Sequence, residues 1–194
     1  MIVKQVSFED KARQDLIDGI NTLADAVKST LGARGKTVII ESENHTHGST
    51  VTKEGVTVAK SINLMHPTQN LAVTMMKEAA ENTAVSAGDG TTTAIVLTEA
   101  LVKAGMELID EETNNTEVLK ILKEESKSII SQLHKKGKKI AGNKLKDVAV
   151  ISANNDEKIG KQIADVYKEV GKDGIVTVEK SKTHETYYES TKGI

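Results

Sequence analysis

Apolar residues recur at intervals of three and four over most of the first 136 residues, and this spacing constrains the fold more than any other feature. The clearest series runs through Ala12, Leu16, Ile20, Leu23, Ala24, Val27 and Leu31. Such intervals place the side chains on one face of an α-helix of about six turns. Similar patterns predict helices over 71–87, 93–109 and 116–136. The chain is therefore expected to be mainly helical.

Small β elements are expected beside these helices. Two β-branched runs at 37–41 and 50–52 predict a hairpin with a polar tip, and a further helix is predicted over 55–62. After Lys136 the basic, polar stretch GKKIAGNKLKD favours a domain boundary. The predicted fold class is mainly α with small β elements, an α+β arrangement.

Beyond the predicted boundary the pattern changes to short apolar runs. VAVIS at 148–152 predicts a strand, and IVTVE at 175–179 predicts another that pairs with 185–189. Between them, Asn155 or Asp156 predicts the cap of a helix that ends near Val170.

Composition excludes several classes of function. With no cysteine, disulfides, thiolate zinc sites and iron–sulfur clusters are ruled out. The 26 Lys+Arg against 28 Asp+Glu argue against a nucleic-acid partner, and one Phe with three Tyr gives few faces for base stacking. The sequence contains no run of 18 apolar residues, so no membrane span is predicted. Acidic residues near the start argue against a leader peptide. A cytoplasmic location is expected.

The strongest candidate site is the GDGTTT segment, Gly88 to Thr93, which lies between two predicted helices. Two glycines let backbone amides approach a ligand closely, and the start of the next helix favours an anion. Asp89 suits a Mg²⁺ ion held between its carboxylate and a phosphate. The alternative is a glycine-flanked turn in which a threonine caps the next helix.

Weaker candidates lie earlier in the chain. Gly32 ends a helix after Thr30 and Leu31, where free carbonyls suit a cation or an adenine edge. Gly35-Lys36-Thr37 is not a P-loop, because Thr30 occupies the position of its first glycine and a helix precedes it. In Lys53-Glu54-Gly55 the carboxylate could orient a water, although a surface turn is favoured for this segment alone. His45 and His47 have the spacing of a weak metal site, but a solvated loop is favoured.

Four ordered segments carry a resemblance to a known family: TLGARGKTVIIE, VTKEGVTVAK, AGDGTTTAIVL and VISANND, the last followed by VGKDGIVTVE. In this order they resemble the group I (GroEL-like) chaperonins, from about Lys4 to the end of the chain. The resemblance implies a helical equatorial ATP-binding domain, of which 1–136 is the first part, and an α/β intermediate domain, of which 137–194 is the first part. Gly193 matches the intermediate–apical hinge, so the apical domain and the returning halves of both other domains are expected to be absent.

The resemblance also implies the ligands, ATP with Mg²⁺ and K⁺. The residues that match nucleotide-contacting positions are Thr30, Leu31, Gly32, Ala33, Lys53, Gly55, Asp89, Gly90, Thr91, Thr92 and Thr93. Asp89 matches the Mg²⁺ ligand, and Thr30, Lys53 and Thr92 match positions that help to hold K⁺. Glu54 and Asp89 match the positions that act in hydrolysis.

Three departures from the family pattern bear on activity. Ala33 replaces a usual proline beside the adenine, and Glu54 replaces a common Asp, which shifts the water-orienting oxygen by about one C–C bond. The hairpin tip is longer than usual, and in the family this hairpin pairs with a neighbouring subunit. The family's second hydrolytic Asp lies in the return segment, so low turnover is expected.

The function implied by the resemblance is ATP-driven assistance of protein folding by a ring of chaperonin subunits, seven-membered in the family. Unfolded clients and a co-chaperonin are expected as partners only where an apical domain is present. The alternative hypothesis is a non-catalytic module that interacts with chaperonin subunits without an ATPase activity of its own. An independent small nucleotide-binding protein is the third and least favoured hypothesis.

Overall fold

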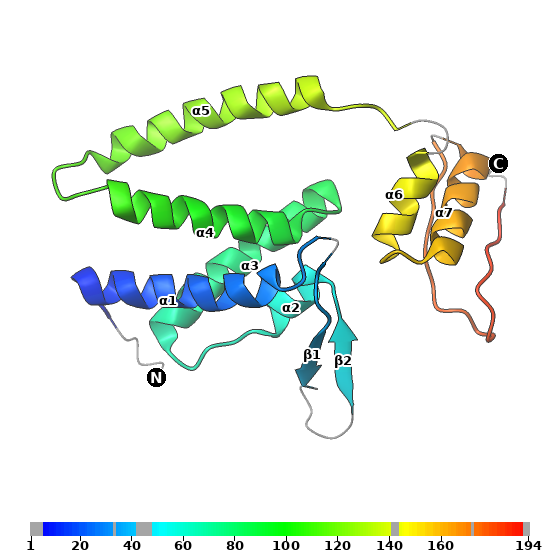
Figure 1. Ribbon diagram of the computed structural model, residues 1–194, viewed down its shortest axis with the longest axis horizontal. Helices are drawn as coiled ribbons and strands as arrows, with labels where there is room; N and C mark the ends of the chain where they lie inside the picture. The colour runs from blue at the N-terminus through cyan, green and yellow to red at the C-terminus, as the bar shows by residue number, and fades with distance from the viewer. Residues whose placement is uncertain (1–5, 33, 42–47, 141–143, 172, 192–194) are drawn as a thin grey trace. The chain divides into compact units, whose positions relative to one another are not determined.

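The structure, a computed structural model, describes residues 6–32, 34–41, 48–140, 144–171 and 173–191. Within these ranges the chain forms seven helices and one two-stranded sheet (Figure 1), so the prediction of a mainly helical fold with small β elements is confirmed. The chain divides into two compact units, 1–119 and 120–194, and the division falls within the sequence of helix α5 (Asn115–Lys136). The predicted domain boundary after Lys136 lies further along the chain and stays a prediction.

Three helices of the first unit, α1 (Glu9–Lys28), α3 (Pro67–Ala87) and α4 (Thr91–Leu108), pack around one core with the short α2 (Gly55–Ser61). The apolar face that the sequence predicts for α1 is the one that the core buries. Its fully buried members Leu23 and Val27 each stabilise the fold by about 1.5–3 kcal/mol. Gly19 of α1 lies against the backbone of Gln69 in α3, where a side chain would not fit.

The predicted hairpin is present. β1 (Val38–Glu41) pairs antiparallel with β2 (Ser49–Thr52), with Val38 opposite Thr52 and Ile40 opposite Thr50. Val38 and Ile40 pack against the core, while the alternate residue Ile39 is exposed, as the two-residue period of a strand requires. The tip with His45 and His47 lies outside the described residues.

In the second unit the prediction of a strand at 148–152 is wrong. These residues end helix α6 (Lys144–Ser152), which packs against α7 (Glu157–Val170). The physical reason is that a short apolar run cannot distinguish a strand from a buried helix segment. Here Ala149 is buried, and Gly160 of α7 lets that helix approach Val150 closely. The predicted cap is confirmed, since Asp156 Oδ1 accepts a hydrogen bond from Ile159 N at 2.9 Å.

The predicted strands at 175–179 and 185–189 are also wrong, because the described residues from 173 to 191 contain no strand. Ile175 and Val178 are exposed, so neither side of such a ribbon would bury an apolar face. An isolated two-stranded pair is marginal without that burial.

Helix α5 carries an apolar row that nothing in the described part of the chain buries. Its exposed apolar side chains are Leu119, Ile121, Leu122, Ile129, Ile130 and Leu133. Over the described ranges, no helix combines the length and the apolar character needed to cross a membrane.

Candidate nucleotide site

The first unit brings together three segments that the sequence keeps apart: the end of α1, the start of α2 and the start of α4. The contact between them is at Gly55. A methyl group on this residue would overlap Thr92 Oγ1 and would approach Thr92 Cβ to 3.2 Å and Val27 Cγ1 to 3.4 Å. Gly55 is buried, so the start of α2 is packed between α1 and α4 with no room for a side chain.

The GDGTTT segment forms the short connection between α3 and α4. Gly88 and Gly90 have φ values of 73° and 90°, a left-handed conformation that L-residues with side chains rarely adopt. Between them, Asp89 is exposed, and its Oδ1 accepts a hydrogen bond from Gly90 N at 2.6 Å. The two glycines thus turn the chain sharply into α4.

The expectation that a threonine caps α4 is wrong. The N-cap residue is Gly90, Thr91 is the first helical residue, and no side chain makes a cap hydrogen bond. The helix predicted over 93–109 therefore begins two residues earlier than expected, at Thr91. A helix that begins without a side-chain cap offers its first amides and the positive end of its dipole to an anion.

The turn after α1 carries the second group of predicted residues. Thr30 is buried, with 9% of its surface exposed, and its hydroxyl donates to Val27 O at 2.7 Å. Leu31 is exposed and Gly32 adopts a φ of 73°. The turn is closed by a hydrogen bond from Lys36 N to Ser29 O at 2.7 Å. Ala33 lies outside the described residues.

Glu54 has a structural task that the sequence did not predict, because it caps α2. Its Oε1 accepts from Val56 N at 2.9 Å, and its Oε2 accepts from the amide and the hydroxyl of Thr57, both at 2.6 Å. Both oxygens therefore face the first turn of α2. Lys53 beside it is exposed.

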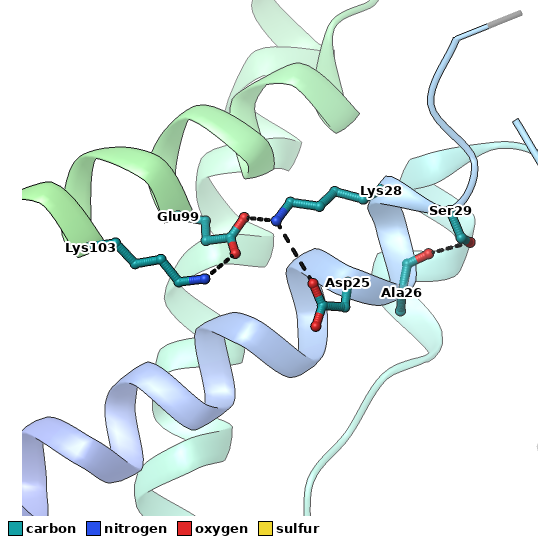
Figure 2. A network of polar contacts seen from close by, with 6 residues as sticks. All are labelled: Asp25, Ala26, Lys28, Ser29, Glu99 and Lys103. Carbon is teal, nitrogen blue, oxygen red and sulfur yellow. Dashed lines mark hydrogen bonds and ion pairs between the residues drawn. The ribbon is translucent and has the colours of Figure 1, made fainter. Parts of the chain in front are cut away.

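An ionic network around one buried carboxylate joins α4 to α1 close to these segments (Figure 2). Glu99 of α4 is only 3% exposed, and its carboxylate contacts Lys28 Nζ of α1 through Oε2 and Lys103 Nζ through Oε1, the latter at 2.7 Å. The Nζ atom of Lys28 also lies 3.8 Å from Asp25 Oδ1. Burial acts to raise the pKa of Glu99, but hydrogen bonds from Lys103 and Lys28 outweigh it and hold that pKa below its ordinary value. The hydrogen bond to Glu99 raises the pKa of Lys28.

A Mg²⁺ ion at Asp89 would need further oxygen ligands besides this carboxylate. Among the residues described, no group of three or more His, Cys, Asp or Glu side chains could hold a metal ion, and Asp89 is a single exposed carboxylate. Mg²⁺ is commonly bound in this way, through one or two carboxylates, substrate phosphates and water. Asp89, directly before the uncapped start of α4, fits that arrangement.

A family model, described as the TCP-1/cpn60 chaperonin family, matches residues 23–194. The chain belongs to this family. Among solved structures, the chaperonin gp146 from the bacteriophage EL 2 (Pseudomonas aeruginosa), crystallised in the presence of ATP-BeFx, is 28% identical with a TM-score of 0.71. It covers 82% of this chain, which in turn spans 28% of gp146.

A group III chaperonin in the open state has the same fold, with a TM-score of 0.67 at 24% identity. That match covers 85% of this chain and 34% of the group III chain. The chain therefore spans about a third or less of the chaperonin structures that it matches. The activity of a whole chaperonin is accordingly a proposal for this chain.

The Lys28–Glu99–Lys103 network was missed by sequence reasoning. One signal was available: Thr91, Ile95 and Glu99 follow one another at intervals of four, and all three are buried. A glutamate on the buried row of an amphipathic helix needs a cationic partner, and Lys103 stands four residues further on.

Proposed function

We propose that this chain is the ATP-binding part of a chaperonin subunit of the group I type, which assists protein folding through ATP-driven changes in a ring. The observation that carries the proposal is the contact of Gly55 with Thr92 and Val27, which brings two signature segments together at the end of α1, where Thr30 of the third segment donates to Val27 O. A turn with merely structural tasks would not require all three to converge.

In the proposed site each segment contacts a different part of the nucleotide. Thr30, Leu31 and Gly32 are assigned to the adenine side, as is Ala33 outside the described residues, and Lys53 and Gly55 are assigned to the phosphates. Gly90 and the amides of Thr91, Thr92 and Thr93 bind phosphate oxygens at the uncapped start of α4. Asp89 holds Mg²⁺ together with the phosphates, and oxygens of Thr30, Lys53 and Thr92 hold K⁺. The hydroxyl of Thr92 faces Gly55, two residues after Lys53 in the chain, which supports this last assignment.

Hydrolysis by this chain alone is proposed to be slow. Glu54 and Asp89 are the proposed hydrolytic residues, yet both oxygens of Glu54 accept hydrogen bonds from the first turn of α2. To orient a water, Glu54 would have to give up part of the α2 cap. Efficient turnover would then need the further parts of a full-length subunit, whose relatives are about three times as long as this chain.

The exposed apolar row of α5 supports a partner that is itself a chaperonin chain. We propose that further chaperonin sequence, in the same subunit or in a neighbour, covers this row, because an apolar row of this size is unfavourable in water. Client proteins and a co-chaperonin are partners only of an assembly with an apical domain, and the proposed location is the cytoplasm.

The second candidate function is a module that joins chaperonin subunits without an ATPase activity of its own. The occupied carboxylate of Glu54 and the exposed row of α5 favour it. ATP turnover of the isolated chain separates the two candidates, since the first predicts slow turnover and the module predicts none.

The proposal is tested by measuring MgATP binding to the chain by calorimetry, with Asp89→Asn as the test variant. The substitution removes the charge that would hold Mg²⁺, so binding should weaken about tenfold or more, in line with about 1.5–3 kcal/mol for an interaction with a charged group. Without Mg²⁺ the parent and Asp89→Asn should bind ATP alike.

Asp110→Asn is the matched control, because Asp110 is also an exposed loop aspartate and lies just beyond the other end of α4. It should bind MgATP like the parent. A parent chain that binds no MgATP contradicts the proposed function, and so does an equal loss of affinity in Asp110→Asn.

A further inference from the structure

Glu99 stands out because it is a buried acid that joins two of the segments assigned to the nucleotide site. On α4 it shares the buried row with Thr91 and Ile95. Eight residues of helix separate Glu99 from Thr91, which corresponds to about 12 Å along a rigid rod. A shift of Glu99 relative to α1 therefore shifts the first turn of α4, where the GDGTTT segment ends, by a similar amount.

On α1, the partner Lys28 is the last helical residue and supports the turn that follows. Its carbonyl accepts from Leu31 N at 3.1 Å, and the next carbonyl, that of Ser29, accepts from Lys36 N. Figure 2 shows Lys28 reaching from α1 to the carboxylate of Glu99, with Lys103 approaching from the same helix as Glu99. Of the two lysines, only Lys28 ties α4 to α1.

A stable helix pair does not require such a pair of charges. An ion pair such as this one, in which Glu99 is buried and Lys28 is 37% exposed, often contributes no more stability than apolar residues of the same volume, and its best-attested use is to fix one register. The apolar contacts of Ile95 and Val27 already hold α4 against the core. The ion pair fixes the register between the two helices. The carboxylate of Glu99 can contact both lysines only when the end of α1 lies at one position along the axis of α4.

We propose that Glu99 is a positioning residue of the nucleotide site, which acts through Lys28 to fix the turn after α1 at one distance from the GDGTTT segment. The inference rests on the proposed nucleotide site. Adenine and phosphates are joined by a linker of limited length, so a nucleotide gains full contact with both segments only within a narrow range of their separation.

The test compares five variants of the chain by MgATP calorimetry and by hydrogen exchange without nucleotide. Glu99→Gln and Lys28→Met should each weaken MgATP binding about three- to thirtyfold. The double variant should lose no more affinity for MgATP than the more affected single variant, because both substitutions remove the same ion pair. Lys28→Arg keeps the cation and should bind like the parent. Glu107→Gln is the matched control, since Glu107 is an exposed glutamate of the same helix.

Hydrogen exchange gives a readout that does not depend on nucleotide. In Glu99→Gln and Lys28→Met the amides of Leu31 and Lys36 should exchange faster, while amides of the α3 core such as that of Met76 should keep the exchange rate of the parent. Lys28→Met serves if Glu99→Gln does not fold, because Lys28 lies at the surface with a side chain 37% exposed.

The outcomes separate the inference from the proposed function. A parent chain that binds no MgATP contradicts the proposed function, and the exchange of Leu31 and Lys36 then decides the tie by itself. Unchanged exchange at these two amides overturns the inference, and so does a uniform acceleration that includes Met76, which would indicate a merely structural contribution. Equal effects of Glu107→Gln and Glu99→Gln also overturn it.

Discussion

Substitution of Gly55 by alanine tests the contact on which the nucleotide site depends. The backbone of Gly55 lies at the start of α2 and is not in the left-handed region, so alanine can adopt it without strain. The obstacle is space. The added methyl group would overlap Thr92 Oγ1, stand 3.2 Å from Thr92 Cβ and stand 3.4 Å from Val27 Cγ1.

The expected cost follows from two opposing effects. Adding a methyl group to a filled interior costs about 1–3 kcal/mol, since neighbouring side chains must leave their preferred rotamers. Replacing glycine by alanine in a helix gains about 0.5–1 kcal/mol at most, and less at its first residue. Gly55→Ala should therefore lower the free energy of unfolding by about 1–2 kcal/mol. Because Thr92 must rotate or move, MgATP binding should weaken as well.

Urea unfolding followed by circular dichroism measures the stability change. Gly105→Ala is the matched control, because its methyl group would meet only Ile109 Cδ1 at 3.7 Å, an ordinary contact. This control should be stabilised by about 0.5–1 kcal/mol. All three tyrosines follow residue 119, so tyrosine fluorescence reports on the second unit alone.

A double-mutant cycle with Thr92→Ala identifies the contact itself. Removal of the Thr92 hydroxyl relieves the overlap and leaves the approaches of 3.2 Å to Thr92 Cβ and 3.4 Å to Val27 Cγ1, so the double variant should recover about 1 kcal/mol relative to the sum of the single changes. The reasoning is refuted if Gly55→Ala is as stable as Gly105→Ala, or if the two changes at positions 55 and 92 are additive.

Three further predictions concern carboxylates. The pKa of Glu99 in the folded state lies below its ordinary value of 4.5. The carboxylate therefore stabilises the fold fully above pH 4.5, and this stabilisation is lost as the pH falls through the lower pKa of the folded state. The difference in urea midpoint between the parent and Glu99→Gln should accordingly shrink on acidification below 4.5. Glu54→Ala should lose about 1 kcal/mol of stability with the cap of α2, whereas Glu54→Asp should keep the cap and raise any ATP turnover, which a phosphate-release assay measures. Asp156→Ala should lose about 1 kcal/mol in tyrosine-detected unfolding with the cap of α7, and Asp165→Ala, within the same helix, should lose less.

The parts of the fold that the sequence predicts well are those in which one local pattern decides the structure. The apolar row of α1 from Ile20 to Val27 has the period of a helix, and the core buries that row. Asp156 could be recognised as a cap because its effect is confined to the next three residues. The strand at 148–152 was predicted wrongly because a run of four apolar residues has no period of its own, and its packing against Gly160 decided for a helix.

The candidate site shows the same division between local and distant causes. The glycines at 88 and 90 could be assigned to a sharp turn from the sequence, since the reason for them lies within the turn. The reason for Gly55 lies 37 positions away at Thr92, and the reason for Glu99 lies at Lys28 on another helix, so neither could be read from its neighbours. Glu54 shows the converse, because a local cap holds a carboxylate for which a distant, hydrolytic task was predicted. The residues that a single sequence explains least are therefore those that hold the three segments of the proposed site together, and their substitution distinguishes an assembled site from three independent turns.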